Sequence, residues 1–259
     1  MALSPNAVQY SLLGVAAGGG LSVYGWLFDR EERSLAQAPL TPVGSLQRGN
    51  AAVVTGAVSC PALTYGPASA KPCAFYREEV QVLRVGRVGT GRKALYGEYW
   101  QVASERAIGG FFVTDPSGKA FVAAAGAKAD CLQHKEESRE GAGLVEGDTW
   151  TRELRIDEGD NATVLGTPHS LGELIDYMGA REGGPTLPPE LIEVLLRLQG
   201  AGEDFPCFYC DGAAFLVSGE GYEAFKKDLE SSANAWLSVG LLIGGLSAFI
   251  LIAAWLGFV

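Results

Sequence analysis

Residues 235–259 form a long apolar run that any fold of this chain has to accommodate. The run reads AWLSVGLLIGGLSAFILIAAWLGFV and contains no charged residue. It exceeds the roughly 20 apolar residues that a helix needs to cross a hydrocarbon core, and a helix satisfies its own backbone hydrogen bonds in lipid. Trp236 and Trp255 stand near its two ends, and aromatic residues favour membrane interfaces. The run predicts a transmembrane helix; the alternative is a buried helix in a large soluble core.

A second apolar run, AVQYSLLGVAAGGGLSVYGWLF, occupies residues 7–28. A cleaved signal peptide is the alternative, but the preceding MALSPN carries no Lys or Arg and the run is long for a signal. We therefore predict a multi-pass membrane protein with transmembrane helices at 7–28 and 235–259, a linker at 29–47 and a soluble domain at 48–234. Basic residues flank both runs on the domain side, which favours a cytoplasmic domain. Long loops cross membranes largely regardless of charge, so the side stays open.

The charge balance and the cysteine count limit the function classes. The chain has 30 Asp and Glu against 20 Lys and Arg, a net charge of -10. This excess of negative charge argues against a nucleic-acid partner, because binding phosphates requires a basic surface. Five cysteines, an odd number, fit a reducing compartment or an oxidising one with one thiol left over. Two histidines leave little room for metal sites or for histidine-based catalysis.

The clearest local signal is a hairpin at residues 111–123. The apolar FFVT is followed by Asp115-Pro116-Ser117-Gly118 and then by KAFVA. Asp in the first position, Pro in the second and Gly in the fourth are typical of a type I turn. We therefore predict two antiparallel strands joined at this turn.

The remaining segments predict a β-rich domain with a few late helices. Short or alternating apolar runs bounded by turn residues are typical of strands. Ser170-x-x-Glu173 is a capping box, and Pro188-Pro189 is typical of a helix start that leads to an end at Gly200. Strands are expected at residues 52–58, 73–83, 94–106, 151–156, 162–166 and 207–218, a long loop at 128–150, and helices at 170–178 and 188–200. The fold class is then α+β, and the strand pattern resembles a small Greek-key barrel of the OB type.

Five segments, taken in order, resemble a known domain family. They are VTGAV within residues 53–58, GPASAKPCAFYREEV (66–80), FVTDPSGKAFV (112–122), IDEGDNATVLG (156–166) and FLVS (215–218). Together with the two apolar runs, they resemble the GIDE domain, or beside-a-membrane domain, of mitochondrial membrane-anchored E3 ubiquitin ligases and their prokaryotic relatives. The resemblance implies a module between two transmembrane helices, with structural motif positions at Gly56, Pro67, Cys73, Asp115, Gly118, Gly159 and Gly166.

The chain departs from that family after the second apolar run. Ligases of the family carry a RING finger there, which needs about eight Cys and His ligands for two zinc ions. This sequence has five Cys and two His, and none of them follows residue 235. We therefore expect a non-catalytic binding or scaffold module at the membrane, with an unknown protein partner. The alternatives are a component of an E3 ubiquitin ligase system whose RING comes from another chain, or a thiol-redox protein.

The thiol-redox alternative depends on Cys207-Phe208-Tyr209-Cys210, a C-x-x-C sequence. The two cysteines could form a redox pair, half of a zinc site completed by Cys60 and Cys73, a structural disulfide, or two buried thiols. A redox C-x-x-C normally opens a helix, whose N-terminus stabilises the thiolate, whereas a strand is expected here. No residue pattern predicts a catalytic group, a metal site or a cofactor site, and His134 is expected in a solvated charged loop.

Overall fold

The computed structural model describes residues 38–88, 95–128, 132–141, 145–180, 186–212 and 215–227. Pro39–Tyr222 form one compact unit. This unit begins within residues 29–47, which were expected to be a linker. Its elements are η1 (Val43–Ser45), β1 (Ala52–Ser59), β2 (Thr64–Tyr65), β3 (Pro72–Cys73), β4 (Phe75–Val88), β5 (Leu95–Gly109), β6 (Phe111–Asp115), β7 (Gly118–Val122), β8 (His134–Glu140), β9 (Thr149–Ile156), β10 (Asn161–Gly166), α2 (Leu171–Ala180), α3 (Pro189–Gly200), β11 (Cys207–Phe208) and β12 (Leu216–Ser218).

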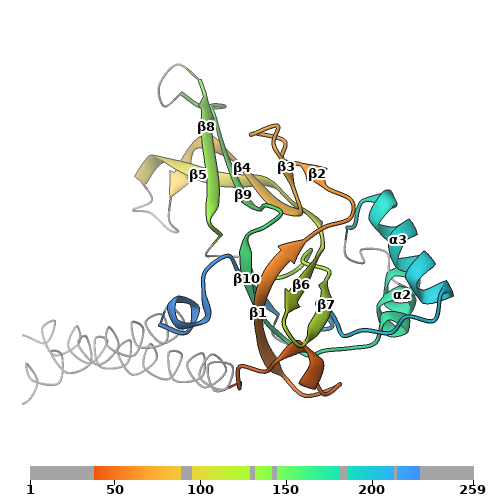
Figure 1. Ribbon diagram of the computed structural model, residues 1–259. Helices are drawn as coiled ribbons and strands as arrows, with labels where there is room; N and C mark the ends of the chain where they lie inside the picture. The colour runs from red at the N-terminus through yellow and green to blue at the C-terminus, as the bar shows by residue number, and fades with distance from the viewer. Residues whose placement is uncertain are drawn as a thin grey trace, which may run out of the picture. The chain divides into compact units, whose positions relative to one another are not determined.

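The larger sheet has six strands in the order β11-β7-β6-β1-β10-β12 (Figure 1). β1 is central and pairs antiparallel with both β6 and β10. The sheet curls, as a bridge between distant segments shows. Lys128, six residues after the end of β7, forms this bridge with Leu216 in β12. The amide of Lys128 donates to Phe215 O at 2.9 Å, and the amide of Val217 donates to Lys128 O at 3.1 Å. The chain beyond β7 therefore meets the opposite edge of the same sheet.

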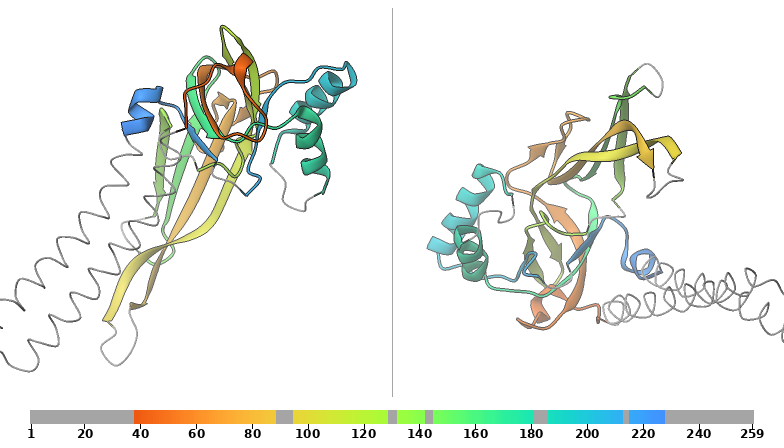
Figure 2. Two further views of the ribbon diagram at one scale, coloured as in Figure 1. Left: turned by 90° about the horizontal axis from the view of Figure 1, so that it is seen from below. Right: turned by 180° about the vertical axis from the view of Figure 1, so that it is seen from behind.

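The smaller sheet has four antiparallel strands in the order β5-β4-β9-β8. β9 continues through the turn around Gly159 into β10, so the two sheets share a chain segment. Residues 84–88 of β4 pair with β5 but not with β9, and β4 and β5 therefore run on beyond the other two strands (Figure 2). The register between β4 and β5 shifts between Val80 and Gln81, as at a β-bulge.

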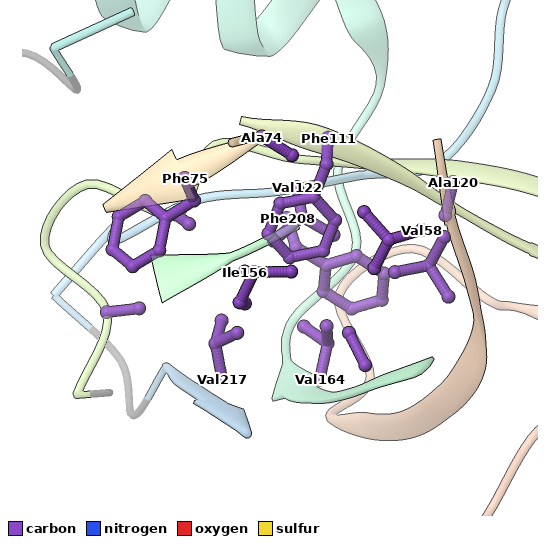
Figure 3. Packing of buried hydrophobic residues seen from close by; sticks show 14 of the residues in the cluster. Val58, Ala74, Phe75, Phe111, Ala120, Val122, Ile156, Val164, Phe208 and Val217 are labelled. Carbon is purple, nitrogen blue, oxygen red and sulfur yellow. The ribbon is translucent and has the colours of Figure 1, made fainter. Parts of the chain in front are cut away.

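The main core lies inside the curled sheet and reaches the base of the smaller one. Phe75 of β4, Phe111 of β6 and Phe208 of β11 are fully buried and converge there (Figure 3). Val164 of β10 and Val217 of β12 belong to the same buried cluster (Figure 3). Full burial of such a side chain contributes about 1.5–3 kcal/mol relative to its exposure to water.

The two helices form a second core with the outer side of the β6–β7 hairpin. α2 and α3 lie next to each other on that side (Figure 1). Leu174 of α2 and Leu191 and Leu195 of α3 are fully buried in one cluster with Phe121 of β7. Leu196 is 47% exposed, so α3 buries one face and leaves the other exposed.

Two local predictions are confirmed. The hairpin forms with Asp115 opposite Gly118, and Asp115 Oδ1 accepts hydrogen bonds from the amides of Ser117 (2.7 Å) and Gly118 (3.0 Å). The capping box forms as well. Glu173 N donates to Ser170 Oγ at 3.1 Å, and Ser170 N donates to Glu173 Oε2 at 2.7 Å.

The membrane part of the expected fold class and the multi-pass location are not supported. The unit is β-rich, and α2 and α3, with 10 and 12 residues, would be only about 15 and 18 Å long at a rise of 1.5 Å per residue. A bilayer core is about 30 Å thick. Among the described residues, no helix is long and apolar enough to cross a membrane. The two runs predicted to span, residues 7–28 and 235–259, lie outside the described residues.

Two further expectations for the strands were wrong. Residues 128–150 were expected to form a long loop, but they contain β8 and the start of β9. β8 reads HKEESRE, and its many charged residues concealed its pairing with β9. The strand expected at 207–218 is instead two short strands, β11 and β12, which lie at opposite edges of the six-stranded order.

Candidate functional site

Two charged side chains of β9 are buried. Glu153 is 0% exposed and Arg155 is 4% exposed. Successive side chains of a strand point to opposite faces of a sheet. Glu153 and Arg155 therefore lie on the face opposite to Leu154 and Ile156, which belong to the main core. Charged residues are almost never buried unless they are paired, so the burial of these two residues indicates that nearby partners compensate for their charges.

Glu153 holds the loop that joins β2 to β3. Its Oε2 accepts hydrogen bonds from the amides of Ala68 (2.7 Å) and Ser69 (3.2 Å). Its Oε1 accepts a hydrogen bond of 2.6 Å from Ser69 Oγ. The loop approaches so closely that a Cβ added at Gly66 would collide with Glu153 Oε1. One buried carboxylate thus satisfies three donors of a loop more than 80 residues away in the sequence.

The loop itself is tightly wound and strained. Gly66 N donates to Lys71 O at 3.0 Å, and Ala70 N donates to Gly66 O at 2.8 Å. Ala70 has a φ of +54°, a left-handed conformation that costs a non-glycine residue about 1–3 kcal/mol and persists only where surrounding contacts enforce it. Next to this loop, Tyr65 is 66% exposed. The loop therefore presents a large aromatic side chain from a backbone that several hydrogen bonds fix.

Arg155 links Glu153 to further carboxylates. Its Nε donates to both oxygens of Asp157, at 3.0 and 3.3 Å. Its Nη1 lies 3.5 Å from Glu153 Oε1 and 3.7 Å from Glu136 Oε1, which are distances of ion pairs without well-formed hydrogen bonds. Burial alone would lower the pKa of Arg155, but Asp157, Glu153 and Glu136 outweigh it and raise the pKa.

The rim of this group is formed by β8 and by the turn after β9. His134 Nε2 lies 3.2 Å from Asp160 and 3.5 Å from Asp157. Lys71 of the loop donates to Glu136 at 3.1 Å, and this hydrogen bond lowers the pKa of Glu136. We refer to Glu136, Glu153, Arg155, Asp157, Asp160 and His134 as the charge cluster. His134 therefore lies in a strand and contacts two carboxylates, contrary to the expected solvated loop.

The charge cluster has a structural role, because its carboxylates pair with Arg155, with His134 or with groups of the β2–β3 loop. Within the described ranges, no set of three or more His, Cys, Asp and Glu side chains is arranged to hold a metal ion. Removing charges from water costs several kcal/mol per ion, and only good partners compensate for it. In this cluster the compensation comes from the loop amides, Ser69 and Arg155. The arrangement therefore fixes the shape of the β2–β3 loop.

The cysteines considered for redox or zinc chemistry are free thiols. Cys207 is fully buried at the start of a strand, and burial together with Asp204 raises its pKa. Cys210 is partly exposed, and Tyr177 Oη donates to its carbonyl at 2.5 Å. Burial raises the pKa of Cys73 to about 12 and also raises that of Cys60. For Cys60, Cys73 and Cys207, burial therefore disfavours the thiolate that redox chemistry requires.

The structure describes the remaining motif positions as well. Gly56 lies where β1 and β6 approach so closely that a Cβ would collide with Thr114 O. Gly159 has a φ of +90° in the turn between β9 and β10. A Cβ at Gly166 would lie 3.2 Å from the rings of Phe208 and Phe215. Pro67 belongs to the loop above Glu153, and Cys73 ends β3.

Sequence reasoning did not find Glu153, Arg155 or His134 as members of one site. The available signal was the alternation of β9, TWTRELRI, which puts a Glu and an Arg on the face opposite to its Leu and Ile. Comparison with known proteins adds nothing to these assignments, because no family model, curated protein or solved structure matches the chain. The GIDE and OB-type resemblances therefore remain predictions from the sequence.

Proposed function

We propose that residues 39–222 form a non-catalytic protein-interaction module whose recognition surface is the β2–β3 loop with Tyr65. The observation that carries the proposal is that Glu153, fully buried, uses its carboxylate to hold this surface loop. A hydrophobic residue would avoid the desolvation of a buried charge. Recognition of the fixed loop by a partner would explain why the protein tolerates the cost of desolvating this carboxylate.

The loop has the properties of a pre-organised binding surface. Fixing a loop in its bound conformation lowers the entropy lost on binding. Tyr is among the residues that most often dominate interface energies, since it offers a large ring and a hydroxyl with few rotatable bonds. Tyr65 is 66% exposed, and Pro67, Ala68 and Ala70 beside it are exposed as well. The loop thus offers a compact, mostly apolar contact surface.

The scaffold function implied by the GIDE resemblance agrees with this proposal. The two alternatives gain no specific support from the described residues. Of the four described thiols, three are buried and none forms a disulfide, and no observation on the described residues points to a ubiquitin-transfer component.

The proposal is tested by site-specific photo-crosslinking in cells. A photo-reactive amino acid replaces Tyr65 in one version of the 259-residue chain and Leu196 in a control version. Leu196 is 47% exposed on α3, so it reports chance contacts of an exposed apolar position. We expect a defined protein partner to be crosslinked from position 65 and not from position 196.

A second variant separates the shape of the loop from the presence of Tyr65. Ser69→Ala removes one of the three hydrogen bonds to Glu153 while leaving position 65 unchanged. We expect weaker crosslinking from position 65 in this background, with the same yield of folded protein. Identical protein sets from positions 65 and 196, or full crosslinking in the Ser69→Ala background, would show that the held loop is not the recognition surface.

A further inference from the structure

β5 is a long edge strand of the smaller sheet. It has 15 residues, and its partner strand in the sheet order is β4 alone. On its other side, the described residues provide one backbone hydrogen bond, from Gly109 N to Thr186 O at its very end. Residues 101–106 are all exposed. An edge strand of this kind presents free N–H and C=O groups to which another strand can add.

The two edges of the smaller sheet differ in their protection. β8, at the opposite edge, carries five charged residues among its seven: Lys135, Glu136, Glu137, Arg139 and Glu140. Charged side chains on edge strands are a common protection against unwanted strand pairing. The middle of β5, residues 99–104, reads YWQVAS and contains no charge. The middle of β5 therefore lacks the charged side chains that protect β8.

β5 also carries an apolar strip on one face. Trp100 pairs with Leu83 and Val102 pairs with Gln81, so both point to the same face as alternate residues of β4. Trp100 packs edge-on against Trp150 with 6.1 Å between ring centroids, and Val102 is 51% exposed. An added strand could place two alternate side chains against Trp100 and Val102.

Carboxylates border this strip at both ends. Glu98 pairs with Val85 and Glu105 with Glu79, so both lie on the face of Trp100. Glu105 is 2.6 Å from Arg77, whereas Glu98 has no ion-pair partner among the described residues. Opposite charges placed across neighbouring strands stabilise pairing, and like charges oppose it. The acidic border therefore favours an added strand with basic residues at its ends.

We propose that β5 accepts an extended segment of a partner protein, apolar in its middle and basic at its ends, as a fifth strand of the smaller sheet. The partner is a foreign chain rather than a second copy, because each copy carries a net charge of -10 and the β5 edges of two copies would bring Glu98 and Glu105 together. This surface is separate from Tyr65 and its loop, so it goes beyond the function proposed above.

The test measures binding of designed peptides to the purified 259-residue chain. The probe is a fluorescent peptide of alternating valine and threonine with lysines at both ends, and its matched control has glutamates at the ends. We expect the lysine peptide to bind about tenfold more tightly than the glutamate peptide. One or two favourable charge pairs, which the glutamate peptide cannot form, account for a difference of this size. Bound peptide should slow amide hydrogen exchange over residues 99–104.

Two substitutions on exposed edge positions make the result specific. Val102→Lys introduces into β5 the kind of charge that protects β8, and Ser138→Lys adds a charge to β8 itself. Circular dichroism and thermal unfolding check that both variants fold as the unmodified chain does. Val102→Lys should abolish binding of the lysine peptide, while Ser138→Lys should leave it unchanged.

Other outcomes overturn the proposal. These are equal binding to the Val102→Lys variant, slowed exchange elsewhere than in β5, equal affinity for both peptides, or a stable dimer of the chain whose contact protects β5. The proposed function is tested independently, because Val102→Lys leaves Tyr65 and its loop intact and should not alter crosslinking from position 65.

Discussion

Two carboxylates hold loops in this protein, Asp115 in the β6–β7 turn and Glu153 under the β2–β3 loop. Asp115 is only partly buried, and its Oδ1 accepts from groups two and three residues away. Its Oδ2 accepts a hydrogen bond of 2.9 Å from the amide of Val43. Glu153 is fully buried, and its loop partners lie 84 or 85 residues away. The same chemical group is thus used once near water and once in the interior.

The difference between the two sites is energetic as well as geometric. If Asp115 is removed, water can reach the two freed amides of the exposed turn, and the loss there is that of ordinary hydrogen bonds. If Glu153 is removed, Arg155 remains buried with one fewer carboxylate and the loop amides lose their acceptor. Removing one partner of a buried charge pair is among the most damaging substitutions in proteins. Loss of Glu153 is therefore expected to cost more stability than loss of Asp115.

Glu153→Ala is expected to have the largest effect. The free energy of unfolding should fall by about 3–5 kcal/mol, because the substitution leaves buried donors and an incompletely paired Arg155. Urea unfolding followed by circular dichroism measures the change. Glu98→Ala, an exposed Glu on β5, is the control and should stay within about 0.5 kcal/mol of the unmodified protein. A loss below about 1 kcal/mol for Glu153→Ala would mean that the loop is held by other contacts.

The same contrast between local and distant partners explains which features could be predicted from the sequence. The hairpin at Asp115-Pro116-Ser117-Gly118 and the capping box at Ser170 and Glu173 use partners within three residues, so their chemistry is visible in a short window. The cluster of Glu153 forms only when β2, β3, β8 and β9 come together. No short window contains that information.

The hydrophobic pattern of the sequence did not predict β8, because most side chains of this strand are charged. The alternation of HKEESRE carries no apolar face, because one side of β8 adds His134 and Glu136 to the charge cluster and the other is solvated. A hydrophobic pattern cannot report a strand whose inward side chains are charged. The apolar runs at 7–28 and 235–259 predicted spanning helices, but the runs lie outside the described residues, among which no helix is long and apolar enough to cross a membrane.

Asp115→Ala is expected to have a smaller effect than Glu153→Ala. Three backbone amides lose their acceptor, but two of them belong to an exposed turn and can bind water. By analogy with the loss of a capping side chain, the free energy of unfolding should fall by about 1–2 kcal/mol. The same urea titration measures it. Because the two sites share no partner, the double variant with Glu153→Ala should show the sum of the two losses within about 0.5 kcal/mol. Strong non-additivity would contradict their independence.

The smallest expected effect is the pH dependence of the Asp115 contribution. Partial burial tends to raise the pKa of Asp115, but hydrogen bonds from Ser117, Val43 and Gly118 outweigh it and hold the pKa below the ordinary value of 3.8. A carboxyl whose pKa is lower in the folded state stabilises the fold above its unfolded pKa, and the contribution is lost as the pH falls through the folded value. The stability difference between the unmodified protein and Asp115→Asn should therefore be constant above about pH 5 and shrink below about pH 4.

Urea unfolding of both proteins between about pH 6 and pH 3 measures this difference, and the subtraction removes the contributions of the other carboxylates. The change should remain below about 1 kcal/mol, since water screens a partly exposed carboxylate. A difference that does not vary with pH would show that Asp115 acts through hydrogen-bond geometry and not through its charge. In that case the charge would matter only at the buried site, and the contrast with Glu153 would become sharper.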